Sequence, residues 1–175
     1  MNRLPLLMIA PLAALAGCQS VGEIPTERLG SATLHFANGL PAGTAQLLAV
    51  GDGASVTVAL AGVSQGTHAV HLHTTGSCQA PDFTSAGGHL NPEHKEHGTQ
   101  NPKGAHLGDL PNAEIGSNKT GTITARLNGT RQQVLDAIFD SDGTAVVVHA
   151  GPDDYVSDPA GNAGGRVACG VFNPA

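Results

Sequence analysis

Tryptophan is absent from this chain of 175 residues, and aromatic residues make up only 3% of it. Lys and Arg together number 8 against 14 Asp and Glu, which gives a formal net charge of −6. Because nucleic acids are bound largely through clustered positive charge, this balance argues against a general nucleic-acid binder. Because aromatic residues are so few, a core must rest on Val, Leu, Ile and Ala rather than on large rings. The length of the chain suits one domain.

The apolar run at the N-terminus, residues 4–16, is too short for an ordinary membrane-spanning helix. It follows a short positive segment and ends in "LAGC", which resembles the lipobox of bacterial lipoproteins. We therefore expect residues 1–17 to be a signal peptide, Cys18 to carry a lipid that anchors the protein to a membrane, and residues 18–30 to form a lipidated tether. A plain secretory signal cut nearby is the alternative. Either signal would export the domain, residues 31–175, to the periplasm or cell envelope.

Cysteine is scarce, with three residues at Cys18, Cys78 and Cys169. If Cys18 carries lipid, an even pair remains. An exported domain meets an oxidising compartment, so we expect a disulfide between Cys78 and Cys169. Two buried free thiols are the alternative.

Short segments of alternating polar and apolar residues, bounded by glycine, fill much of the chain. Val56, Val58 and Leu60 share one face of such a segment, and "GDG" at 51–53 indicates a hairpin turn. Many short strands at close spacing predict an all-β sandwich or barrel. The expected strands are residues 31–37, 44–50, 54–63, 67–73, 121–129 and 144–150. Residues 130–140 fit either a helix or a strand.

Two stretches lack a strand pattern, residues 74–118 and residues 150–165. They are rich in Gly, Pro and Asn, and a structureless loop of this length in a compact domain is usually functional or disordered. A disulfide at Cys78 and a bound metal would explain how the first loop is held.

Histidine is abundant, with nine residues, and "HAVHLH" at 68–73 holds three of them. His71 and His73 are two apart, so both face the same side of a strand. A polar face that carries histidine by chance is one interpretation. A metal site is the other, because imidazole suits zinc and copper. Three His and one Asp make a closed zinc site, and four His suit the tetragonal field of Cu(II). Seven residues can serve both ions if one imidazolate bridges them.

Seven motifs in this order carry a family resemblance: "HAVHLH", "GSC", "SAGGHLNP", "HG", "HLGDLPN", "VVHAG" and "GNAGGRVACGV". Over roughly residues 31–173 the chain resembles the bacterial copper,zinc superoxide dismutases of the lipoprotein type. The resemblance implies a Greek-key β-barrel or sandwich of about eight antiparallel strands with two long functional loops. It also implies superoxide as substrate, one copper per chain that cycles between Cu(II) and Cu(I), and one structural zinc.

The resemblance also implies the site residues. The copper ligands correspond to His71, His73, His89 and His149. The zinc ligands correspond to His89, His97, His106 and Asp109. His89 is thus the bridge and a catalytic residue. Asp153 lies where the family has an Asp that links one copper histidine to one zinc histidine, and Arg166 lies at the active-site Arg that attracts the anion. Cys78 and Cys169 match the family disulfide.

The remaining histidines fit other roles. His68 occupies a family position that is structural and hydrogen-bonded. His94 lies close to His97, but the spacing from His89 favours His97 as the ligand. His35 is interpreted as a surface residue.

Some positions depart from the family and leave questions open. Ala69 and Val70 replace a Gly-aromatic pair that is common between the first two histidines. The loop from 150 to 165 has no Lys, and Lys95 and Lys103 are either solvated charges or attract superoxide. Bacterial relatives often pair through an interface that contains Trp, so this chain, which has none, is either a homodimer of another kind or a monomer.

Three other functions compete with a copper,zinc dismutase. A copper-binding protein of the same fold without turnover would be favoured by loss of a copper histidine or of the Arg. A copper-only dismutase would lack the zinc residues. A zinc hydrolase would need an open position on zinc and a general base, which a closed set of three His and one Asp does not leave.

Overall fold

The computed structural model describes residues 27–175. The expected signal peptide, Cys18 and most of the expected tether lie outside these residues. Within the described part of the chain, no helix is long and apolar enough to cross a membrane.

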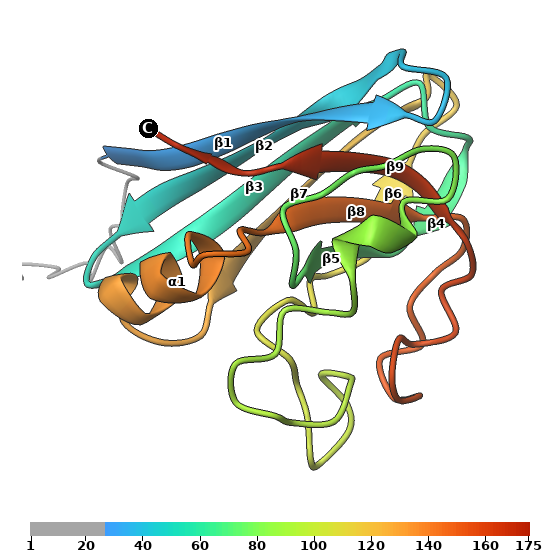
Figure 1. The fold of residues 1–175 in the computed structure, drawn as a ribbon. Coiled ribbons are helices and arrows are strands. Elements are labelled where there is room, and N and C mark those ends of the chain that lie inside the picture. The colour runs from blue at the N-terminus through green and yellow to red at the C-terminus, as the bar shows by residue number, and fades with distance from the viewer. Residues whose placement is uncertain (1–26) are drawn as a thin grey trace, which may run out of the picture.

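The fold is built almost entirely from strands (Figure 1). The strands are β1 (Glu27–Phe36), β2 (Pro41–Val50), β3 (Gly53–Ala61), β4 (Gly66–His68), β5 (Val70–His73), β6 (Ala113–Ile115), β7 (Thr120–Leu127), β8 (Ala145–His149), β9 (Arg166–Val171) and β10 (Asn173–Pro174). One α-helix, α1 (Arg131–Ile138), and one 3-10 turn, η1 (Thr84–Ala86), complete the elements of residues 27–175.

Eight of these strands form one antiparallel sheet in the order β5-β8-β9-β1-β2-β3-β7, with β10 paired to β1. The neighbours β9–β1 and β3–β7 are not consecutive in the chain, which gives the crossing connections of a Greek key. β4 and β6 form a separate pair, and because β4 leads into β5 and β6 packs beside β7, this pair links the two edges of the curled sheet. The predicted all-β Greek-key fold of about eight strands is therefore confirmed.

The core fills the space inside the curled sheet and follows the alternation of the strands. Val56, Val58 and Leu60 of β3 are buried there, as their shared face predicts. From the opposite layer, Val70 and Leu72 of β5 point into the same core. Side chains of β5 alternate between its two faces, so the remaining two residues of this strand lie on the outer face.

The undecided segment after β7 is helical. Thr130 caps α1 and accepts from Gln133 N, while the Gln133 side chain accepts from Thr130 N in return. This reciprocal capping satisfies two backbone donors of the first turn. Val134 and Ile138 lie one turn apart and are both fully buried, so the apolar spacing is that of a helix packed on the core.

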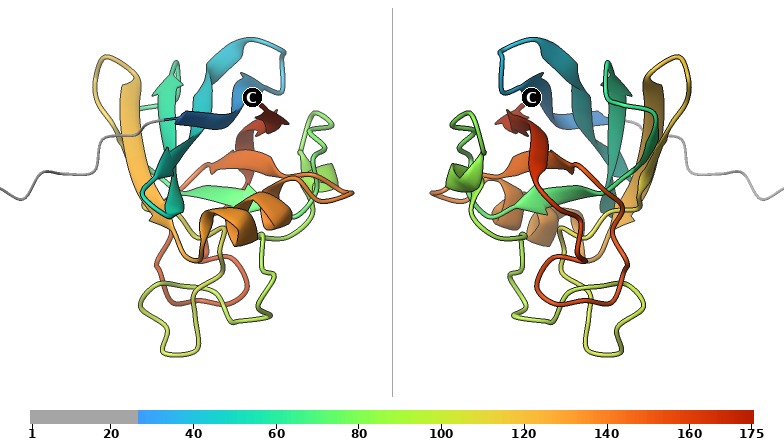
Figure 2. Two further views of the ribbon diagram at one scale, coloured as in Figure 1. Left: turned by 90° about the vertical axis from the view of Figure 1, so that its left-hand side faces the viewer. Right: turned by 90° about the vertical axis from the view of Figure 1, so that its right-hand side faces the viewer.

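Some boundaries differ from the expected ones. β1 begins at Glu27, so residues 27–30, expected in the tether, lie in the sheet, where Arg28 pairs with Leu48 and Leu29 packs on the core. The first long loop also contains η1 and β6, which are too short to show a period in sequence. The two long loops extend from the same side of the sheet, next to β5 and β8 (Figures 1 and 2).

Candidate metal centre

β5 presents two histidines to the side of the sheet that faces the long loops. Because Val70 and Leu72 point into the core, His71 and His73 point away from it, and both are buried beneath the loops. Backbone hydrogen bonds fasten the first loop to this strand: Leu72 N donates to Gly108 O at 2.9 Å, and Leu90 N donates to Leu72 O at 2.8 Å. These bonds place the residues next to Gly108 and Leu90 beside the two strand histidines.

One group of four histidines gathers over β5 and the end of β8. The side-chain nitrogens of this group lie within 4.8 Å of one another: His71, His73, His89 and His149. Nε2 of His73 and Nε2 of His149 are 3.4 Å apart. Nδ1 of His71 and Nε2 of His89 are buried and have no hydrogen-bond partner. Buried polar atoms are normally paired, so these two nitrogens are suited to donate to a metal ion.

A second group adjoins the first and shares one residue with it. Oδ1 of Asp109 lies 2.9 Å from Nδ1 of His89, 3.0 Å from Nδ1 of His97 and 3.1 Å from Nδ1 of His106. Ligands at about 2.0–2.1 Å from a tetrahedral zinc lie about 3.3 Å apart. The spacing of these four atoms is close to that value, so the group fits a closed zinc site. His89 turns Nδ1 to this group and Nε2 to the four-histidine group.

Backbone carbonyls hold three of the other histidines through the nitrogen that does not face a group. His73 Nδ1 contacts Gly87 O at 2.9 Å, and His149 Nδ1 contacts Gly164 O at 3.1 Å. His106 Nε2 contacts Lys95 O at 3.1 Å. Each ring nitrogen that donates to a carbonyl leaves the other nitrogen with a free lone pair, which fixes the tautomer a metal requires.

A single carboxylate holds the last two histidines. Oδ2 of Asp153 lies 2.8 Å from His71 Nε2, and Oδ1 lies 2.9 Å from His97 Nε2. His71 belongs to the first group and His97 to the second, so Asp153 connects the two groups behind the shared His89. The structure thus brings together the seven candidate ligands and Asp153 from β5, the end of β8 and the two long loops.

Three residues that the sequence analysis missed hold the second loop in place. The side chain of Asn112 pairs with both backbone groups of Asp153, at 2.9 and 3.0 Å. Asn112 N donates to the Tyr155 hydroxyl at 2.9 Å. Asp158 Oδ1 accepts from His97 N at 2.7 Å. Asn112 stands in the motif "HLGDLPN", but its role depends on contact between two loops, which spacing does not reveal.

Burial favours the uncharged form of three histidines of the first group, His73, His89 and His149. It lowers the pKa of His73 to about 2 and that of His149 to about 3, and nearby histidines and Arg166 add to the effect. It also lowers the pKa of His89 to about 4, although the hydrogen bond to Asp109 opposes the shift. Neutral imidazole is the form that binds a metal, so these three rings are ready to bind well below neutral pH.

His97 behaves in the opposite way because it lies between two carboxylates. Burial would lower its pKa, but hydrogen bonds to Asp109 and Asp153 raise it to about 9. Burial would likewise raise the pKa of both carboxyl groups, yet the histidines that bond to them hold those pKa values below the usual range. Without a metal, this part of the site is an ion pair, and a cation that binds there displaces a proton.

These opposed shifts predict a stability maximum near neutral pH for the metal-free protein. His73, His89 and His149 have lower pKa values when folded than the ordinary value of about 6.5, so the unfolded chain binds more protons and stability falls as pH drops below that value. The pKa of His97 is raised to about 9, so its contribution is lost as pH rises through 9. We expect the melting temperature of the metal-free protein to fall both below and above neutral pH. An unchanged melting temperature between pH 7 and pH 5 would contradict these shifts.

Arg166 lies beside the first group at the start of β9. It donates to Phe83 O and to Gly87 O, both at 2.6 Å. Partial burial lowers its pKa, but a guanidinium stays charged in proteins. A cavity of about 340 Å³ is lined by Arg166 together with His73, His89 and His149. A small anion that enters this cavity therefore meets a fixed positive charge next to three of the four histidines.

The remaining candidates lie elsewhere. His68 is buried and its Nδ1 contacts His149 O at 2.7 Å, which fits a structural role. His35 and His94 are exposed. The predicted disulfide is confirmed, with Cys78 and Cys169 joined and their Cα atoms 5.6 Å apart.

Comparison with known proteins identifies similar chains. A family model described as copper/zinc superoxide dismutase matches residues 41–172. Superoxide dismutase [Cu-Zn] 1 of Aquifex aeolicus is 48% identical over 107 residues, which are 59% of this chain and 62% of that protein. Superoxide dismutase [Cu-Zn] of Deinococcus radiodurans is 34% identical and covers 95% of this chain and 96% of its own. The crystal structure of a SOD-like protein from Bacillus subtilis superposes with a TM-score of 0.76 at 34% identity, over 83% of this chain and 99% of that one.

Proposed function

The chain belongs to the copper/zinc superoxide dismutase family, and from this we propose that it converts two superoxide anions and two protons to dioxygen and hydrogen peroxide. One observation carries the proposal. His89 offers one nitrogen to each of two groups of ligand atoms. Both groups are complete, and Arg166 lines the neighbouring cavity. A site for two different ions that share one imidazole requires such an arrangement.

The residues fit the two metals that the family uses. The four nitrogens of His71, His73, His89 and His149 suit copper, which prefers imidazole in a tetragonal field. The group of His89, His97, His106 and Asp109 suits a zinc site that is closed to substrate. Copper, when bound, supplies one-electron oxidation and reduction of superoxide between its two oxidation states.

His89 can supply a proton to the product. Its Nε2 is buried without a protein partner, and its Nδ1 faces Asp109 at 2.9 Å. Nε2 has one lone pair, so it would hold either copper or a proton. With Nδ1 held on the zinc side, the ring could carry a proton at Nε2 into the cavity whenever copper is not bound to that nitrogen. Peroxide needs two protons, and solvent that reaches the cavity is the second source.

Arg166 binds and orients the anion. The whole chain carries a formal charge of −6, but local charge in a cleft decides how a small anion is captured. Lys95 is paired with Glu93 at 2.6 Å, and Lys103 with Glu96 at 2.9 Å. Since both lysines have carboxylate partners, we assign the attraction of superoxide to Arg166.

Each competing function fits this site less well than a copper/zinc dismutase does. A copper-only dismutase has no use for His97, His106 and Asp109, yet these three converge on His89. A zinc hydrolase needs an open position on zinc, whereas four protein atoms surround this one. A copper-binding protein without turnover needs neither Arg166 nor its cavity.

We also propose that the protein works outside the cytoplasm, held to a membrane by a lipid on Cys18. The bond between Cys78 and Cys169 supports export, since disulfides persist in oxidising compartments. Mass spectrometry of the protein recovered from membranes would test the anchor. A mature N-terminus at Cys18 that carries acyl chains is the expected result.

The function is tested by following superoxide decay after pulse radiolysis, with copper and zinc quantified in the same sample. We expect decay near the diffusion limit, about 10⁸–10⁹ M⁻¹s⁻¹, at one copper and one zinc per chain. We expect the metal-free protein to have no effect, and copper to restore the activity. A fully loaded protein that leaves the decay of superoxide unchanged would make it a metal-binding relative without turnover.

A further inference from the structure

Gly161, in the motif "GNAGGR", lies directly behind the carboxylate that connects the two groups of ligands. A Cβ at this position would clash with Asp153 Oδ1 and would lie 2.6 Å from Asp153 Cγ and 2.7 Å from His97 Nε2. The backbone φ of Gly161 is +63°, a value that residues other than glycine rarely adopt. Any side chain here must therefore push against the bond between Asp153 and His97.

Asp153 has little room to yield to such a push. It is buried, and each of its oxygens already contacts one histidine. Oδ1 also accepts from Tyr155 N at 2.7 Å. Its backbone is fastened to the first loop by the two hydrogen bonds of Asn112. A displaced carboxylate would lose His71, His97 or both.

Gly161 has little room to move away. Its N donates to Ser157 O at 2.7 Å, and its O accepts from Asp154 N at 3.0 Å. These bonds fold residues 154–161 into a compact turn that covers Asp153. The turn and the carboxylate fit only when position 161 has no side chain.

We propose that Gly161 is a positioning residue for the zinc site, whose missing side chain leaves the space in which Asp153 bonds to His71 and His97 together. The inference rests on the zinc site of the proposed function, but it does not depend on turnover. Gly161 belongs to neither group of ligand atoms and does not line the cavity beside Arg166, so it acts entirely through Asp153 and His97.

The test measures the zinc affinity of the metal-free protein by competition with a chromogenic chelator. We expect Gly161→Ala to weaken zinc binding about 10- to 100-fold, as loss of a carboxylate behind a ligand histidine typically does. Two glycines serve as controls. Gly165 lies in the same loop, and a Cβ added there would meet no heavy atom of a non-neighbouring residue within 4 Å. Gly39 has a φ of +82° and equally open space, so Gly39→Ala reports the cost of the backbone conformation alone. Both controls should bind zinc within about twofold of the wild type.

A double mutant separates this role from general damage to the loop. With Asp153→Ala the atoms nearest to the new Cβ are gone and only the contact with His97 Nε2 remains, so adding Gly161→Ala should weaken zinc binding much less than it does in the wild-type background. If Gly161→Ala alone does not fold, the same Asp153→Ala change is expected to restore folding. An equal loss of affinity in both backgrounds, or wild-type affinity in Gly161→Ala, would overturn the proposal. A wild-type protein that binds no zinc would instead refute the zinc site itself.

Discussion

Substitution of His89 by alanine is expected to lower superoxide turnover by more than about 100-fold and to weaken zinc binding in the same protein, because even residues behind the ligands typically contribute 10- to 100-fold. His89 is the one residue shared by both ligand groups within residues 27–175. Its removal takes Nε2 from the copper position and Nδ1 from the zinc position. It also leaves Asp109 with one fewer of the hydrogen bonds that hold its pKa low.

Two variants make this double effect specific. His73→Ala removes a nitrogen from the copper group only, so it should lose activity and keep zinc affinity near that of the wild type. His35→Ala changes an exposed residue of β1 and should keep both. Metal content, zinc affinity and superoxide decay are measured on all three proteins. A His89→Ala protein with unchanged zinc affinity would show that the imidazole does not join the two sites.

The fold could be predicted in the segments where polar and apolar residues alternate, but not in the segments that lack this alternation. Val56, Val58 and Leu60 repeat every second residue, so their strand and its buried face follow from the sequence. Residues 130–140 have no such period. Their helix depends on the capping pair of Thr130 and Gln133 and on the docking of α1 against the core. β6 has three residues, too few for any period.

For the site, residue type decides which residues the sequence can identify. All seven proposed ligands are His or Asp, and their chemistry marks them in sequence before any contact is known. Asn112 and Gly161 carry no such mark, and Asp158, although an Asp, does not belong to either group of ligand atoms. Asn112 bonds to the backbone of the second loop, and Asp158 accepts from a backbone N–H of the first. Gly161 matters for an atom that it lacks. Such roles arise only when two loops far apart in sequence are packed together, so sequence alone does not reveal them.

The disulfide is expected to contribute more to stability than any other single feature of the domain. Cys78 and Cys169 are 91 residues apart, and the chain-entropy relation assigns a loop of that length about 4–5 kcal/mol. We expect the double variant Cys78→Ser, Cys169→Ser to lose up to about this much free energy of unfolding in urea. The wild type treated with a reductant should show the same loss, and the serine variant should not respond to the reductant. Equal stability of the oxidised and reduced wild type would contradict the prediction.

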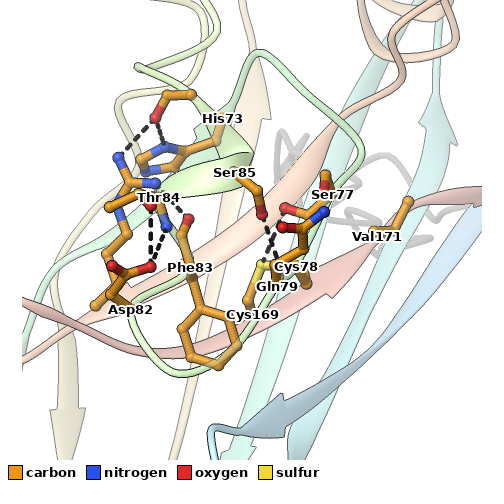
Figure 3. Close-up of a disulfide and its surroundings, with 12 residues drawn as sticks. His73, Ser77, Cys78, Gln79, Asp82, Phe83, Thr84, Ser85, Cys169 and Val171 are labelled. Carbon is orange, nitrogen blue, oxygen red and sulfur yellow. Dashed lines mark hydrogen bonds between the residues drawn. A yellow bond between two sulfur atoms is a disulfide. The ribbon is translucent and has the colours of Figure 1, made fainter.

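Loss of the disulfide should also reach the cavity, because the bridged segment holds Arg166. Cys78 opens the stretch whose carbonyls at Phe83 and Gly87 accept from the guanidinium, and Cys169 lies three residues after Arg166 in β9. Figure 3 shows the disulfide between Cys78 and Cys169 next to Phe83. The Gly87 carbonyl also holds His73. The serine variant should therefore turn over superoxide more slowly even when fully loaded with both metals. A fully active serine variant would mean that β8 and β9 alone orient the arginine, and that the disulfide serves stability only.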